Sequence, residues 1–167
     1  MTTVRQMLDG WKGTLPRVLN YAPTRLAEAW TAMQQLADEL GIGNEGRKRI
    51  KSLKVRCVDV IEKTCMVTYR PTVACIEWMD PLMTAGNWVP EMVDMAGGKS
   101  VLADSAAHSP EVSWDSLRET DPEFLLMMPC GFDIPRTRQE MSFLTNRQGW
   151  KELKAVRKGN VFLADGN

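Results

Sequence analysis

The sequence predicts an α/β fold: a Rossmann-like, mostly parallel sheet with helices on both faces, preceded by a helical linker region. From residue 71 onward, short apolar segments rich in β-branched residues alternate with amphipathic segments, which is the pattern of a layered α/β domain. Residues 24–63 instead repeat apolar residues at three- and four-residue steps, the helical period. A chain of 167 residues with 44% hydrophobic content can bury one moderate core.

The N-terminal third is expected to be mainly helical. Residues 1–14 are polar and form a loose lead-in, and residues 15–21 (LPRVLNY) form a short apolar run that predicts a single strand, although a lone strand needs a partner. Thr24 is expected to cap an amphipathic helix that ends just before Gly41, and a second helix is expected over residues 44–63. Basic residues crowd the outer positions of that second helix. They indicate either a solvated surface or an anion-binding face, and the zero net charge favours the solvated surface.

Residues 71–167 predict the sheet itself. Neither a G-x-G-x-x-G turn nor a G-x-x-x-x-G-K-[ST] loop occurs, which argues against a nucleotide-binding version of the fold. The expected elements are a strand over 72–78, a helix over 89–96, a strand over 100–103, a helix capped by Ser113, a buried strand over 124–128, a helix from Asp133 to Thr145, and a strand over 161–164.

Two segments should lie where ligands bind in open α/β sheets, beyond the carboxyl ends of the strands. Residues 78–91 leave the first of these strands, and residues 129–133 leave the apolar central one. Each combines aromatic rings with carboxylate or amide groups on a turn. Trp78 and Trp88 either cap the core or stack on a large, flat ligand. Their joint presence on one loop favours the ligand.

The sequence offers no catalytic or metal-binding constellation. Its four cysteines form no C-x-x-C pair, and His108 is the single histidine, so we expect no zinc site. Cys130 before Gly131 resembles a nucleophile position at a strand end, but nothing in the sequence supplies a paired histidine. Asp80, Asp133 and Glu91 match the spacing of no paired-carboxylate mechanism. The chemistry predicted is binding, without enzymatic turnover.

The net charge and the distribution of apolar residues limit the classes of partner and the compartment that we expect for the chain. Twenty-one basic and 21 acidic residues give zero net charge, which argues against broad electrostatic binding to nucleic acid. No apolar run approaches the roughly 20 residues of a membrane span. The N-terminus MTTVRQMLDGWKG lacks the apolar core of a secretory signal. We therefore expect the chain as written to remain in the cytoplasm and not to span a membrane.

Three runs resemble a known family. RPTVACIEWMDPLMTAGNWVPEMVDMAGG is similar to the opening of the C-terminal lobe in cobalamin-binding, ABC-importer substrate-binding proteins. VSWDSLRETDPEFLLMMPCGFD resembles the next helix and strand of that lobe, and GWKELKAVRKGNVFLADGN its penultimate segment. The resemblance divides the chain into a remnant of the N-terminal lobe with its last strand (1–23), linker helices (24–70), and a C-terminal α/β lobe that is incomplete at its C-terminus (71–167).

The resemblance implies a helix-linked, two-lobed protein that holds a corrinoid between its lobes and delivers it to an ABC permease. Cobalamin is the implied ligand, and no covalently bound cofactor is implied. Such proteins usually work in the periplasm or elsewhere outside the cytoplasmic membrane. Glu91 would be the surface carboxylate that docks on the permease. Residues implied to face the ligand are Trp78, Asp80, Asn87, Trp88, Phe132 and Asp133.

The chain departs from the family because most of the N-terminal lobe, which forms the other half of the cleft, does not occur in it. Losing half of the burial weakens ligand binding, so we expect a homo-oligomer in which a second copy covers what the missing lobe would cover. Light scattering from a strict monomer at micromolar concentration would contradict this expectation. Two alternatives stay open: a truncated, self-associating interaction protein with a vestigial cleft, and, more weakly, a small cysteine hydrolase that uses Cys130.

Overall fold

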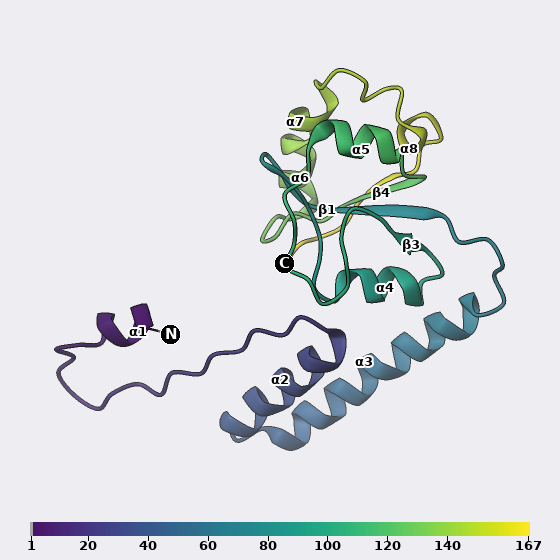
Figure 1. The fold of residues 1–167 in the computed structure, drawn as a ribbon. Coiled ribbons are helices and arrows are strands. Elements are labelled where there is room, and N and C mark those ends of the chain that lie inside the picture. The colour runs from purple at the N-terminus through teal and green to yellow at the C-terminus, as the bar shows by residue number, and fades with distance from the viewer. Residues whose placement is uncertain (1) are drawn as a thin grey trace.

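The computed structural model describes residues 2–167 as an N-terminal segment, a helical arm and an α/β lobe (Figure 1). The predicted strand over residues 15–21 is wrong: the segment forms no strand and runs alone toward the arm. No neighbouring strand satisfies its backbone, and a lone strand is not stable in water. The three helices of this region are α1 (Thr2–Met7), α2 (Leu26–Glu39) and α3 (Gly43–Thr64).

The arm consists of the two helices that the sequence predicts, α2 and α3, which the structure pairs as an antiparallel hairpin (Figure 1). Its entry differs in detail from the expected Thr24 cap. The Glu28 carboxylate instead accepts bonds from the backbone N–H groups of Thr24 (2.8 Å) and Arg25 (3.2 Å). These hydrogen bonds, chiefly the one from the Thr24 backbone, lower the pKa of Glu28. Gly46 lets the helices approach closely, because a Cβ there would lie 2.4 Å from that of Ala37.

The lobe confirms the predicted fold class. Its mixed sheet has the strand order β2-β1-β4-β5, and β3 pairs with the first residues of β1. The β1–β3, β1–β4 and β4–β5 pairs are parallel, whereas β2 runs antiparallel to β1. The strands are β1 (Thr72–Met79), β2 (Leu82–Thr84), β3 (Lys99–Ser100), β4 (Phe124–Met127) and β5 (Val161–Leu163).

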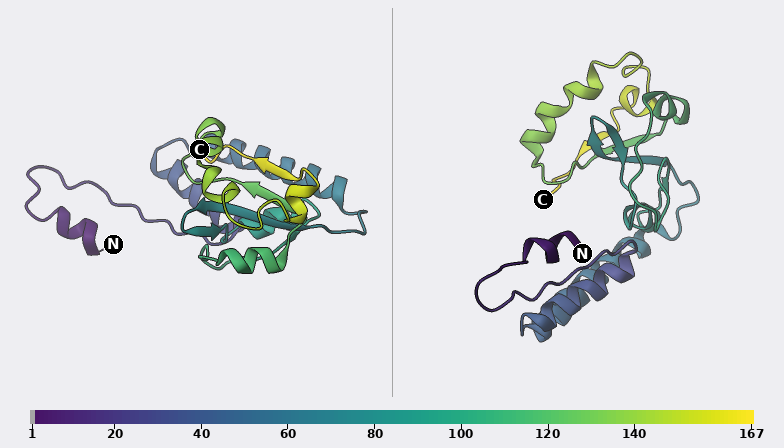
Figure 2. Two further views of the ribbon diagram at one scale, coloured as in Figure 1. Left: turned by 90° about the horizontal axis from the view of Figure 1, so that it is seen from above. Right: turned by 60° about the vertical axis from the view of Figure 1, so that its left-hand side comes forward.

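Helices lie on both faces of the sheet, but they cover the faces unequally (Figures 1 and 2). One face carries four helices and the main core, which includes Ile76, Leu117 and Leu125, all fully buried. Within residues 2–167, α4 (Val89–Met95) is the only helix on the other face. The four helices of the covered face are α5 (Trp114–Thr120), α6 (Ile134–Glu140), α7 (Ser142–Thr145) and α8 (Lys154–Arg157).

Three local predictions within the lobe need correction. The strand expected over residues 100–103 is only Lys99–Ser100. The helix expected from Asp133 to Thr145 divides at Met141 into α6 and α7. Strand β2 was not predicted, because residues 82–84 show too short an apolar pattern to be told from a loop.

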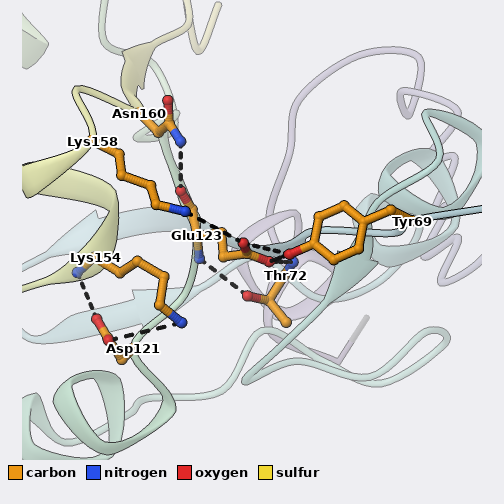
Figure 3. Close-up of polar contacts among 7 residues, drawn as sticks. All are labelled: Tyr69, Thr72, Asp121, Glu123, Lys154, Lys158 and Asn160. Carbon is orange, nitrogen blue, oxygen red and sulfur yellow. Dashed lines mark hydrogen bonds and ion pairs between the residues drawn. The ribbon is translucent and has the colours of Figure 1, made fainter.

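A polar cluster fixes the path from the arm into the lobe, at the edge where β1 and β4 begin (Figure 3). The Tyr69 hydroxyl donates to the Glu123 carboxylate at 2.5 Å, and the Thr72 backbone N–H donates to the same group at 3.2 Å. These bonds lower the pKa of Glu123, and the hydrogen bond to Glu123 raises the pKa of Tyr69. The segment between α3 and β1 is therefore anchored to the turn before β4.

Candidate functional site

An aromatic pair lies at the edge of the sheet where β1 and β4 end. The Trp78 ring, near the end of β1, lies 5.2 Å from the Phe132 ring, which follows β4, at an interplanar angle of 57°. The Trp78 indole N–H donates to the Asp80 carbonyl at 3.1 Å, which holds the ring beside the turn into β2. Phe132 is mostly buried and Trp78 is half-buried. The pair joins the two predicted segments into one surface.

Two arginines that the sequence analysis did not select border this pair. The Arg136 guanidinium lies 3.8 Å from the centre of the Phe132 ring, a cation–π contact. Arg147 approaches the Asp80 carboxylate at 3.3 Å. Asp133 caps α6 by accepting from the Arg136 backbone N–H at 2.8 Å, so the predicted carboxylate positions the cation beside it. Arg136 follows an N-cap aspartate by three residues, and that spacing alone does not reveal which ring its side chain reaches.

The other half of the predicted loop faces a different surface. Asn87 is held by backbone bonds, donating to Ala107 at 2.7 Å and accepting from Ala106 at 3.0 Å, at a left-handed φ of 53°. Gly86 permits this contact, because a Cβ there would lie 2.6 Å from the Ala107 carbonyl oxygen. Trp88 then turns toward the arm and lines a cavity with α2 and α3. The structure thus separates Trp88 from Trp78, and the predicted ligand contacts of Asn87 and Trp88 stay predictions.

Glu91 joins the arm to the lobe. One carboxylate oxygen accepts from the Leu26 backbone N–H at 3.0 Å, at the first residue of α2. The other accepts from the Arg25 guanidinium at 3.2 Å and the Ser105 hydroxyl at 3.0 Å. A carboxylate at a helix N-terminus satisfies free N–H groups and favours the helix dipole. Its predicted docking on a permease stays a prediction, and the carboxylate already has intramolecular partners.

A second polar group at the strand ends was missed by the sequence analysis. The Glu77 carboxylate, half-buried on β1, accepts from the Ser109 hydroxyl at 2.8 Å, and Ser109 Oγ in turn accepts from the Gly86 N–H at 3.1 Å. Desolvation, and then the charge of Glu77, raise the pKa of the nearby Cys130 thiol. A raised pKa opposes thiolate formation, which weighs against the alternative of a cysteine hydrolase. Glu77 was not selected from the sequence, because a single acidic residue inside an otherwise apolar strand forms no recognisable motif.

Within residues 2–167, no group of three or more His, Cys, Asp or Glu side chains is placed to hold a metal ion. Over the same range, no helix combines the length and the apolar character needed to cross a bilayer.

Comparison with known proteins agrees with this architecture. The family model for periplasmic binding proteins matches residues 16–167, whereas no curated protein matches. An ABC transporter substrate-binding protein from Listeria monocytogenes superimposes with a TM-score of 0.75 at 18% identity, over 99% of this chain and 64% of that one. The heme-binding protein RhuT from Roseiflexus gives 0.72 at 16% identity, over 98% and 62%. The vitamin B12-binding protein BtuF of Vibrio cholerae gives 0.66 at 18%, over 98% and 59%.

The chain spans less than two thirds of each of these three structures. At identities below 20%, these superpositions establish a common fold alone. The family is established by the family model, which matches nearly the whole chain. The family is described as periplasmic, so the expectation that the chain stays in the cytoplasm is not supported. The chain belongs to the periplasmic binding protein family.

Proposed function

We propose that this chain is the ligand-binding C-terminal half of a substrate-binding protein for an ABC importer, with a corrinoid such as cobalamin as the ligand. The observation that carries the proposal is the Trp78–Phe132 pair at the carboxyl ends of β1 and β4, the edge at which open α/β sheets bind ligands. The half-buried Trp78 indole, supported by the tilted Phe132 ring, offers an apolar face on which a macrocycle can stack.

Polar groups around the pair would orient such a ligand. Arg136 has a side chain 58% exposed beside Phe132 and can donate to a phosphate or carboxylate of the ligand. Asp80, Asp133 and Glu77 add acceptors for amide N–H groups. Because this half of a cleft leaves the other face of a ligand in water, we expect a Kd between about 10 μM and 1 mM. The raised pKa of Cys130 agrees with a role in binding without enzymatic turnover. In the proposed function, the bound ligand is then delivered to an ABC permease.

Equilibrium dialysis against cyanocobalamin tests the proposal. The wild-type chain should retain the ligand, and Trp78→Ala should reduce its affinity about tenfold or more. Trp11→Ala is the matched control, since Trp11 is 56% exposed in the N-terminal segment, outside the lobe. Failure of the wild-type chain to retain cyanocobalamin at millimolar concentration would refute corrinoid binding. Retention of hemin in its place would assign the surface to a different tetrapyrrole.

A further inference from the structure

Arg147 joins the strand-end site to the helices on the covered face of the sheet. It lies in the loop between α7 and α8, and its guanidinium is 3.3 Å from the carboxylate of Asp80, which lies 67 positions earlier, in the turn between β1 and β2. The Arg147 side chain is 31% exposed and that of Asp80 is 56% exposed. An ion pair this accessible adds little to stability, so its main effect is on the geometry of the turn that it reaches.

The Arg147 side chain is itself held in place by α7 and by a stack of two tryptophans. Its Nε–H donates to the Phe143 carbonyl at 3.1 Å, and its guanidinium lies 5.6 Å from the centre of the Trp114 ring, within range of a cation–π contact. The Trp114 indole N–H donates to the Gln148 carbonyl at 2.8 Å. The same ring stacks at 6.4 Å on Trp150, which is only 7% exposed. Arg147 therefore presents its remaining N–H groups from a position fixed on the core.

Asp80 connects this arginine to the ring on which the ligand is proposed to stack. The Asp80 carboxylate accepts from the Arg147 guanidinium, and the carbonyl of the same residue accepts from the Trp78 indole N–H at 3.1 Å. The Trp78 ring in turn lies 5.2 Å from the Phe132 ring. A displacement of Asp80 therefore moves the acceptor that orients the indole.

The tip of the turn between β1 and β2 depends on Arg147 more than its two ends do. Met79 and Leu82, at the ends, are 4% and 3% exposed and belong to the core. Asp80 and Pro81, between them, are exposed. In the part of the chain that the structure describes, Arg147 is the only side chain that bonds to the Asp80 carboxylate. The core thus fixes the ends of the turn, and Arg147 fixes its tip.

We propose that Arg147 is a positioning residue for the ligand site. It fixes the turn between β1 and β2 through Asp80, and it thereby holds the Trp78 ring in the orientation that a stacking ligand requires. Arg147 acts through Asp80 and does not itself touch the ligand. The inference rests on the proposed function, because it concerns the same Trp78 surface, and it adds a residue that lies outside both of the segments predicted to face a ligand.

The Trp78 indole N–H gives a test that needs no ligand. Its proton NMR signal in the full chain, assigned by its loss in Trp78→Phe, reports the hydrogen bond to Asp80. Arg147→Met keeps an apolar stem beside Trp114 and removes the guanidinium. It should therefore shift the Trp78 signal and speed exchange of the indole proton with water by about threefold or more. An unchanged signal overturns the proposal.

Arg118→Met is the matched control. Arg118 pairs with Asp115 at the same distance of 3.3 Å, but within α5. It also lies beside Gly149, in the loop that carries Arg147, because a Cβ on Gly149 would lie 2.5 Å from the Arg118 Nε. The control thus reports any general loosening of that loop, and it should leave the Trp78 signal unchanged. An equal shift in both variants overturns the proposal.

Equilibrium dialysis against cyanocobalamin tests the consequence for binding. Arg147→Met and Asp80→Ala should each raise the Kd by about three- to fivefold. The double variant should bind no more weakly than Asp80→Ala, since both changes break one contact. If Asp80→Ala restores the affinity lost in Arg147→Met, Arg147 acts by neutralising that carboxylate, and the positioning role is overturned. A wild-type chain that retains no cyanocobalamin, with the Trp78 signal shifted as expected in Arg147→Met, refutes the proposed function and supports the positioning of Trp78.

Discussion

Glu91 offers a direct test of how the arm is held to the lobe. Replacing it by alanine removes acceptors for the Leu26 N–H, the Arg25 guanidinium and the Ser105 hydroxyl. Loss of a side-chain acceptor at a helix N-terminus costs about 1 kcal/mol, with a range of ~0.5–2, and loss of a charge there costs ~0.3–1 kcal/mol. Because the carboxylate is 23% exposed, solvent partly screens the ion pair with Arg25. We therefore expect a total loss of about 1–2 kcal/mol.

Urea unfolding measures this loss. With a slope of ~2 kcal/mol/M for a protein of this size, Glu91→Ala should lower the midpoint by about 0.5–1 M. Glu119→Ala is the control, because Glu119 is an exposed carboxylate on α5 with no partner among the described residues, and its midpoint should move by less than about 0.3 M. Hydrogen exchange should accelerate most in the first turn of α2. An unchanged midpoint, with unchanged exchange there, would show that Glu91 is a free surface carboxylate.

Three further predictions concern the core, the Tyr69–Glu123 hydrogen bond and Cys130. Leu125→Ala, at a fully buried position in β4, should cost about 2–5 kcal/mol in unfolding free energy, which a denaturation curve measures. The lowered pKa of Glu123 and the raised pKa of Tyr69 mean that their hydrogen bond stabilises the fold between roughly pH 4.3 and 10. That contribution is lost as pH falls through the folded pKa of Glu123, and also as pH rises through the folded pKa of Tyr69. Tyr69→Phe should therefore flatten the pH dependence of the unfolding free energy at both the acidic and the alkaline end. Glu77→Gln should speed alkylation of Cys130 at pH 8, because it removes a charge that raises the thiol pKa; an unchanged rate in mass spectrometry would contradict this contact.

The sequence predicted the fold more completely than the site. Elements whose periodicity is long or strongly apolar, such as α3 and β4, begin and end within two residues of their predicted bounds. Short elements that depend on tertiary contacts were not predicted, β2 among them. The strand expected over residues 15–21 failed for the converse reason, since local β propensity produces no strand without a neighbour to accept its hydrogen bonds.

The site shows the same limit at the level of side chains. Trp78 and Phe132 were both selected, because Trp78 ends one predicted strand, Phe132 lies in the segment that leaves another, and strand ends converge at one edge of a sheet. Trp88 was placed with them because it lies in the same segment as Trp78, but the turn at Asn87 and Gly86 directs it toward the arm. Proximity along a loop does not determine which surface a side chain joins. Arg136 reaches Phe132 through helix geometry, which a sequence pattern does not record.

The surroundings of the Trp78–Phe132 pair favour a small-molecule ligand. At the strand ends, the Trp78–Phe132 rings are surrounded by charged groups at defined positions, with Arg136 above Phe132 and Asp80 beside Arg147. Such groups can fix the orientation of a small ligand, and specificity for small molecules depends on them.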